Sequence, residues 1–213
     1  MSTIADIRIE YKKHTLNEAD VNKNPVTQFS SWWQDALQSA IEEVNACTLA
    51  TASAESKPSA RIVLLKDFDE AGFVFYTNYT SNKGHQLSQN PNVALVFFWK
   101  ELERQVRIEG VAEKVLPEES DTYFNSRPEG SKLGAWASPQ SKPIEDRGII
   151  EHNLEKYEKM FEGQTVPRPT HWGGYRVKPN MIEFWQGRPS RLHDRIQYCL
   201  EKDGTWKIER LAP

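Results

Sequence analysis

Four groups of residues in this chain contain basic side chains, and three of them add aromatic or hydroxyl side chains, a combination that can bind phosphorylated ligands. Arg61 and Lys66 bracket the apolar run 62–65. Positions five apart in a strand point to opposite faces, so one of the two is predicted to face a pocket unless a bulge intervenes. The alternative is that both are solvated strand ends, as exposed Lys and Arg residues usually are.

A second group combines the hydroxyls of Tyr76, Thr77 and Ser81 with Lys83. Lys83 falls in the first turn of a predicted short helix, and a helix N-terminus with a nearby lysine suits a phosphate monoester. Ser81 could equally be an ordinary helix cap, and the two interpretations are compatible.

A third group, Tyr123, Arg127 and Ser131, offers a guanidinium and two hydroxyls around a Pro-Gly turn. This combination is typical of a phosphate clamp, because a guanidinium forms strong paired hydrogen bonds to phosphate.

A fourth group lies near the C-terminus, where Arg191, His193 and Arg195 follow Trp185. Their spacing has the period of a strand and predicts that the three share one face. Two arginines and a histidine on one face repel one another unless an anion lies among them. A solvated edge strand is the alternative. Together the four groups predict a β-rich protein that binds phosphorylated planar ligands, with Trp185 or Tyr76 available for stacking.

Other chemistries have no signature in the sequence. The five histidines are scattered, and no metal-binding spacing such as H-E-x-x-H or C-x-x-C occurs, so no metal site is predicted. No G-x-S-x-G, P-loop or G-x-G-x-x-G motif occurs either. The two cysteines, Cys47 and Cys199, lie in strand-like runs and are predicted to be small buried hydrophobic residues.

The elements that must position these groups are mostly strands. Apolar residues in 29–44 recur at helical spacing and predict an amphipathic helix of four turns. Further helices are predicted at 81–89, 117–126 and 143–162, with a long loop at 127–141. The predicted strands, joined mostly by turns, are 47–52, 60–66, 73–77, 92–99, 105–115, 174–187, 192–202 and 206–211. This pattern favours a mainly β, α+β fold: an antiparallel barrel with flanking helices, with residues 1–24 as an N-terminal extension and 25–213 as one domain.

Several motifs, in order along the chain, resemble the pyridoxine (pyridoxamine) 5′-phosphate oxidase family. They are R-I-V-L-L-K, F-Y-T-N-Y-T-S-N-K-G, R-Q-V-R-I-E-G, G-A-W-A-S-P-Q-S, W-G-G-Y-R-V-K-P, E-F-W-Q-G, R-L-H-D-R and the closing R-L-A-P. The resemblance implies an FMN-binding split β-barrel homodimer with FMN at the subunit interface. It also implies oxidation of pyridoxamine or pyridoxine 5′-phosphate to pyridoxal 5′-phosphate. Hydride passes from substrate C4′ to flavin N5, and O₂ reoxidises the flavin to yield hydrogen peroxide.

The resemblance also implies site residues. For FMN these are Arg61, Ile62, Val63, Leu64, Leu65, Lys66, Tyr76, Thr77, Lys83, Gln105, Gln140, Ser141, Trp185 and Arg195. The substrate phosphate is assigned to Lys66, Tyr123, Arg127 and Ser131. Arg191 and His193 are the implied catalytic residues beside the substrate ring and its reacting carbon, and Arg8 and Tyr11 belong to an implied lid over the substrate.

One position departs from the family pattern. Asn82 stands where the family often has arginine before the lysine of S-R-K. Asn82 is therefore assigned only as an uncharged FMN contact. The binding free energy of the FMN phosphate is expected to be weaker by ~1–2 kcal/mol.

The chemistry of the two catalytic candidates differs. Arg191 is a permanent cation and a poor base, so its predicted role is to orient the substrate and stabilise charge near the reacting carbon. His193 has an ordinary pKa near ~6.5 and is predicted to accept or relay a proton.

Three alternatives remain open at this point: another split-barrel FMN enzyme with a different substrate, a non-catalytic module for FMN or pyridoxal phosphate, and a barrel for single-stranded nucleic acid. Retention of the substrate-side residues favours the oxidase. The chain has 213 residues with 27 basic and 30 acidic side chains, and its net charge of −3 argues against nucleic acid. The longest apolar run, 93–99, is too short to span a membrane, and the N-terminus has no signal core. A cytoplasmic protein is predicted.

Overall fold

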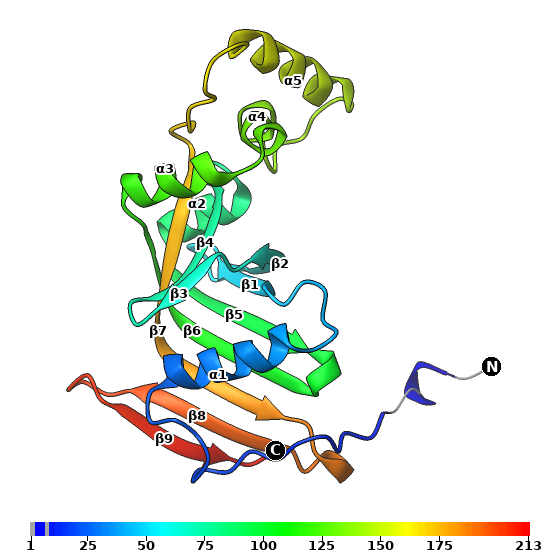
Figure 1. Cartoon of the computed structure of the whole chain (residues 1–213), viewed down its shortest axis with the longest axis vertical. Coiled ribbons are helices and arrows are strands. Elements are labelled where there is room, and N and C mark those ends of the chain that lie inside the picture. The colour runs from blue at the N-terminus through cyan, green and yellow to red at the C-terminus, as the bar shows by residue number, and fades with distance from the viewer. Residues whose placement is uncertain (1–2, 7–8) are drawn as a thin grey trace.

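The computed structural model describes residues 3–6 and 9–213, and these form a mainly antiparallel sheet flanked by helices (Figure 1). The main path of the sheet is β2-β1-β5-β6-β7-β4-β3, and the β8–β9 hairpin pairs with the C-terminal part of β7. The strands are β1 Ala46–Ala52, β2 Pro58–Leu64, β3 Asp67–Asp69, β4 Gly72–Asn78, β5 Asn92–Trp99, β6 Arg104–Lys114, β7 Trp172–Gln186, β8 Asp194–Leu200 and β9 Trp206–Leu211. The predicted fold class, a split β-barrel with flanking helices, is confirmed.

The helices lie in two places in Figure 1. Helix α1 crosses the sheet beside β5 and β6, while α2 and α3 lie toward the end of the molecule from which α4 and α5 project. The α-helices are α1 Pro25–Leu37, α2 Asn82–Gln89, α3 Pro117–Ser126, α4 Glu129–Ala137 and α5 Gly148–Met160, and the short 3₁₀ turns are η1 Ile4–Asp6, η2 Lys100–Leu102 and η3 Pro189–Arg191. No helix in the described ranges is both long and apolar enough to cross a membrane.

The core lies between α1 and one face of the sheet. Strand residues alternate, so Leu95 and Phe97 of β5 point inward and are fully buried. Phe29 of α1 packs edge-on against Phe73 and Phe97, with ring centroids 5.0 and 5.3 Å apart. The apolar stripe of α1 therefore covers the inner face and holds the strands in place.

Helix α1 is shorter than predicted. It ends at Leu37, and its predicted apolar stripe continued to Val44. The backbone N–H and the hydroxyl of Ser39 both donate to Ala36 O, at 3.1 and 2.7 Å, which turns the chain out of the helix. Leu37 is consequently 53% exposed, whereas Val44 is buried beyond the helix.

The predicted loop at 127–141 is wrong, because most of it is helix α4. The backbone N–H groups of Ser131 and Lys132 donate to Pro128 O and form its first turn. The side chain of Trp136 packs on α5, with its ring centroid 5.4 Å from that of Tyr157. Packing between two helices outweighs the Gly- and Ser-rich composition that predicted a loop.

Strand β7 connects the two parts of the sheet. Its N-terminal part pairs with β4 and its C-terminal part with β8, while β6 pairs along most of its length. A β-bulge lies between Glu109 and Gly110 of β6. A Cβ atom at Gly110 would lie 2.1 Å from Lys178 O, so only glycine permits this close approach.

Candidate functional site

A cavity of about 650 Å³ opens beside edge strand β2, between β4, the N-terminus of α2 and helices α3 and α4. Each of the first three residue groups described in the sequence analysis contributes side chains to its lining. Its walls are Arg61, Ile62, Val63, Leu64, Lys66, Tyr76, Thr77, Asn78, Lys83, Tyr123, Arg127, Pro128, Ser131, Gly134, Ala135, Ser138, Gln140 and Trp172.

The prediction that only one of Arg61 and Lys66 faces the pocket is wrong, since both line this cavity. Strand β2 ends at Leu64, so the period of two does not extend to Lys66. Instead the backbone N–H of Lys66 donates to Val74 O at 2.8 Å. Because β2 is the edge of the sheet, side chains from both of its faces reach the cavity at its rim.

Lys83 is positioned by the start of α2. Ser81 is the N-cap, and its hydroxyl accepts a hydrogen bond from Gly84 N at 3.3 Å. Lys83 Nζ then donates to the hydroxyl of Thr77 at 3.2 Å. Burial, and next the charge of Arg61, lower the pKa of Lys83. An anion in the cavity would counteract both effects, because a nearby negative charge raises the pKa of an amine.

Arg61 is held against strand β1. Its Nη1 donates to the hydroxyl of Thr51 at 2.6 Å and to Leu49 O at 3.2 Å. Burial lowers the pKa of Arg61, so its guanidinium lacks full solvation. These neutral partners fix its position without neutralising its charge.

An aromatic stack supports Arg127. The rings of Tyr76 and Tyr123 stack at 4.0 Å, and Tyr76 stacks on Trp172 at 5.5 Å. The guanidinium carbon of Arg127 lies 4.5 Å from the centre of the Trp172 ring, a cation–π contact. Arg127 Nη1 is buried and has no hydrogen-bond partner among the described residues. Burial lowers the pKa of this guanidinium.

Trp172 is a site residue that the sequence reasoning missed. The only available signal was the aromatic residue that opens W-G-G-Y-R-V-K-P, and nothing in that motif places Trp172 beside Arg127. The juxtaposition depends on α3 packing against the start of β7, as in the edge-on contact of Phe124 with Trp172 at 5.2 Å.

The cavity has an excess of positive charge. Arg61, Lys66, Lys83 and Arg127 face it, and none of them forms an ion pair with an acid in the described part of the chain. Lys66 is exposed, but Arg61, Lys83 and Arg127 are half-buried, and half-buried cations without acidic partners are costly unless an anion binds. The arrangement therefore fits phosphate-bearing ligands.

A second cavity, of about 480 Å³, contains the two catalytic candidates. It is lined by Ile9, Glu10, Tyr11, Arg188, Ser190, Arg191 and His193. Ser190 and Arg191 have left-handed backbones, with φ of 56° and 62°. Such backbone strain in non-glycine residues is found preferentially at functional sites.

The hydrogen bonds of His193 determine its tautomer. Its Nδ1 accepts a hydrogen bond from Arg188 N at 3.1 Å, so in the neutral ring the proton is on Nε2. Burial and the charge of Arg191 lower the pKa of His193, while Asp194 raises it. The ring of Tyr11 lies 6.0 Å away.

The prediction that Arg191, His193 and Arg195 share one strand face is wrong. Strand β8 begins at Asp194, so Arg191 and His193 belong to the turn before it. Arg195 donates to buried Glu183 at 2.8 Å, and a carboxylate rather than a bound anion balances its charge. Turn residues that follow Arg188 interrupt the period of two on which the prediction rested.

Gln105, Trp185 and Arg195 form a third group. They are register partners across β6, β7 and β8, and they line a smaller cavity of about 230 Å³ with Arg107, Glu183 and Pro213. None of the three lines the main cavity. Within one chain, the residues assigned to FMN are therefore divided between the main cavity and this smaller one.

Three assigned FMN contacts line none of these cavities: Leu65 is buried in the core, while Asn82 and Ser141 are exposed. Ile62, Val63, Leu64 and Gln140 do line the main cavity. Arg8 lies outside the described residues. Within those residues, no group of three or more His, Cys, Asp or Glu side chains is arranged to hold a metal ion.

Two family models match this chain. The model of a family described as pyridoxamine 5′-phosphate oxidase matches residues 33–161. A second model, for the C-terminal dimerisation region of pyridoxine 5′-phosphate oxidase, matches residues 172–213. The second match includes the turn with Arg191 and His193.

Full-length relatives are similar along the whole chain. A pyridoxine/pyridoxamine 5′-phosphate oxidase from Ralstonia nicotianae is 56% identical over 213 residues, which is 100% of both chains. One from Acaryochloris marina is 57% identical and covers 100% of this chain and 96% of its own.

The solved structures include two similar chains. PhzG from Burkholderia lata, in complex with tetrahydrophenazine-1-carboxylic acid, has a TM-score of 0.86 and 29% identity, covering 92% of this chain and 95% of its own. An FMN-binding protein from Nostoc punctiforme has a TM-score of 0.71 at 16% identity, covering 89% and 98%, and shows the shared fold. On the full-length identity and the two family models, this chain belongs to the pyridoxine/pyridoxamine 5′-phosphate oxidase family, which is FMN-dependent.

Proposed function

We propose that this chain oxidises pyridoxamine 5′-phosphate or pyridoxine 5′-phosphate to pyridoxal 5′-phosphate, with FMN as cofactor, O₂ as final acceptor and hydrogen peroxide as product. The observation that carries the proposal is the main cavity, where four cations face one space and form no ion pair with any acid of residues 3–6 and 9–213. FMN and the substrate each bring one phosphate, so two anionic groups would balance that charge.

The residues present fit FMN. Arg61, Lys83 and Thr77 lie together at one wall and would hold the FMN phosphate. When bound, FMN supplies the two-electron acceptor for the hydride of the substrate. Ile62, Val63 and Leu64, on the edge strand, offer backbone and apolar side chains to its ring system. Asn82 is exposed at the first position of α2 and contributes no charge there.

A second set of residues in the same cavity would hold the substrate phosphate. The buried Nη1 of Arg127 has no hydrogen-bond partner in the described part of the chain, and Tyr123, Ser131 and Lys66 line the same cavity. A phosphate bound there would fix the substrate at a point remote from its reacting carbon and so restrict its orientation.

The division of the FMN residues supports a homodimer with FMN at the subunit interface. Trp172, in the main cavity, and Trp185 lie near opposite ends of the 15-residue strand β7, whose contour at ~3.3 Å per residue is roughly 45 Å. Exposed apolar Ile62 and Phe98 lie on the same sheet face as Trp185. A second chain packed on this face would bring Trp185, Gln105 and Arg195 to the partner's main cavity.

Arg191 and His193 would meet the substrate from the second chain. Arg191 remains a cation, so it can orient the substrate and stabilise negative charge but cannot accept a proton. His193 holds its proton at Nε2 in the neutral ring and can donate that hydrogen bond to a substrate oxygen. Its lowered pKa favours this neutral form at neutral pH.

The test is to purify the protein, measure the FMN released on denaturation, and follow peroxide formation with each phosphorylated substrate. Unphosphorylated pyridoxine serves as the control. Arg191→Leu is expected to lower kcat far more than FMN content. A yellow protein that forms no peroxide with either phosphorylated substrate would refute the activity, and equal loss of flavin and turnover in the variant would refute the role of Arg191.

A monomer that retains FMN in solution would contradict the proposed placement of FMN at a subunit interface. Cytoplasmic location stays a prediction from the sequence, which microscopy of a fluorescently tagged chain tests.

A further inference from the structure

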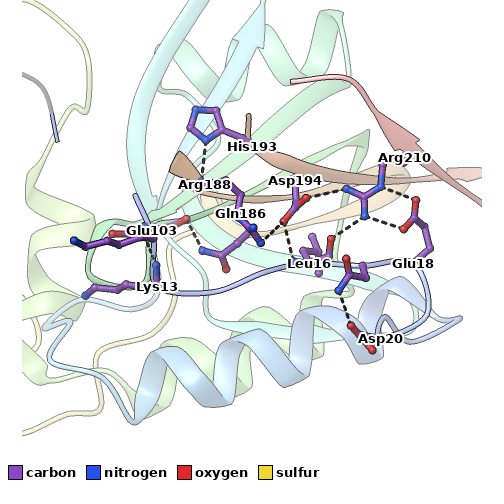
Figure 2. A network of polar contacts seen from close by, with 12 residues as sticks. Lys13, Leu16, Glu18, Asp20, Glu103, Gln186, Arg188, His193, Asp194 and Arg210 are labelled. Atoms are coloured by element: carbon purple, nitrogen blue, oxygen red, sulfur yellow. Dashed lines mark hydrogen bonds and ion pairs between the residues drawn. The ribbon is translucent and has the colours of Figure 1, made fainter. Parts of the chain in front are cut away.

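Residues 9–24, called the strap, run along the sheet rather than away from it. Leu16 is only 5% exposed, and the hydroxyl of Tyr198 donates to Asn22 O at 2.6 Å. Arg210 holds the middle of the strap, with bonds of 2.6 Å to Glu18 and 2.9 Å to Leu16 O, as Figure 2 shows. The polar and weakly patterned segment is therefore docked on the sheet through specific contacts.

Glu103 holds the strap at a second point, close to Tyr11. One carboxylate oxygen of Glu103 accepts hydrogen bonds from the backbone N–H groups of Lys12 at 2.8 Å and Lys13 at 2.9 Å. Lys13 Nζ also donates to Glu101 O at 2.6 Å. These bonds join positions about 90 residues apart in the chain.

The backbone of Glu103 is strained. Its φ of 54° and ψ of 38° place it in the left-handed region, which a residue with a Cβ atom rarely adopts. The residue is also only 6% exposed, unusual for a glutamate. A strained and buried acid is retained where the surrounding structure uses its carboxylate, and here the carboxylate binds the strap.

The same residue holds the end of β7. Glu103 O accepts from Gly187 N at 2.7 Å and from the buried Gln186 side chain at 3.1 Å. A Cβ atom at Gly187 would lie 2.7 Å from the side chain of Tyr11, so Tyr11 packs directly on this glycine. The Tyr11 ring then meets Trp185 edge-on at 5.8 Å.

We infer that Glu103 is a positioning residue for the reaction: through Lys12 and Lys13 it holds Tyr11 against Trp185 and His193. Its carboxylate fixes the strap, and its carbonyl fixes the end of the strand that leads to His193. Glu103 itself lines none of the three cavities described above. The inference rests on the proposed function, because Tyr11 and His193 matter to turnover only if the substrate binds beside them.

The test uses the full-length enzyme with FMN and three variants. Glu103→Asn keeps a residue that tolerates the left-handed backbone, but its side chain is one methylene too short to reach the strap. Glu103→Gln keeps the length and one acceptor oxygen. Glu101→Asn is the matched control, since Glu101 is exposed and its side chain makes no hydrogen bond or ion pair within residues 3–6 and 9–213.

The first readout is steady-state kinetics, which gives KM and kcat for pyridoxamine 5′-phosphate. The second is the rate of trypsin cleavage after Lys12 and Lys13. For Glu103→Asn we expect KM to rise about tenfold with a smaller change in kcat, and cleavage there to accelerate about tenfold. Cleavage after exposed Lys202 is the internal reference and stays unchanged. Glu103→Gln recovers most of both values, and Glu101→Asn matches the native enzyme.

Unchanged KM and unchanged cleavage at Lys12 and Lys13 in Glu103→Asn would overturn the inference. Equal acceleration at Lys202 would also overturn it, because it would show general loss of stability. If the native enzyme oxidises neither phosphorylated substrate, the proposed function fails instead, and the cleavage rates still decide whether Glu103 holds the strap.

Discussion

Replacing Arg127 with methionine separates substrate binding from folding. Methionine retains a flexible apolar side chain over Trp172 but removes the charge and every donor. Among the residues that the structure describes, Arg127 has no acidic partner and its buried Nη1 has no acceptor. Removing one partner of a buried ion pair usually destabilises a protein, because the other charge is left unpaired. The Arg127→Met variant leaves no such charge behind.

The expected rise in KM follows from the hydrogen bonding to Arg127 that the substrate phosphate would lose. A hydrogen bond to a charged group contributes about 1.5–3 kcal/mol. At ~1.4 kcal/mol for each factor of ten, KM for pyridoxamine 5′-phosphate should rise roughly 10- to 150-fold. The melting temperature of the enzyme without ligands should stay the same or rise, because an unpartnered buried donor is removed.

The assay compares peroxide formation from pyridoxamine 5′-phosphate and from unphosphorylated pyridoxamine, with FMN affinity from quenching of flavin fluorescence. Activity on the unphosphorylated amine and FMN affinity should change little. Lys132→Met is the control, because Lys132 is close in sequence but does not line the cavity. An unchanged KM for the phosphorylated amine, or loss of FMN affinity equal to the rise in KM, would refute the assignment of Arg127 to the substrate phosphate.

Three further predictions concern charge. Asn82→Arg should tighten FMN binding by about 1–2 kcal/mol, measured by flavin titration; unchanged affinity would show that this exposed position does not reach the phosphate. Arg191→Gln should raise the pKa of His193 in an NMR titration, because the Arg191 charge lowers that pKa; no rise would contradict the contact. Glu18→Gln should lower the melting temperature at pH 7. Arg210 lowers the pKa of Glu18 from 4.5 to about 2, so the stabilisation by this pair is complete above 4.5 and is lost as pH falls toward 2. The difference between variant and native protein should shrink over that range, and a difference constant with pH would refute the role of the Glu18 charge.

Local sequence patterns alone predicted phosphate-binding chemistry and the class of fold. The apolar run at residues 93–99 and the helical spacing of apolar residues after Pro25 are local patterns, and the structure contains a strand and a helix there. The motifs around Arg61, Lys83 and Arg127 indicated phosphate binding, because residue type and local spacing alone carry that signal.

Which of these residues come together depends on long-range packing. Arg61 and Lys66 line one cavity because β2 is the edge of the sheet, and Trp172 lies under Arg127 because α3 packs on β7. Glu103 reaches the strap across about 90 residues of chain. Periodicity is a property of neighbouring residues, whereas these contacts depend on strand register and on the packing of distant segments, which no local pattern encodes.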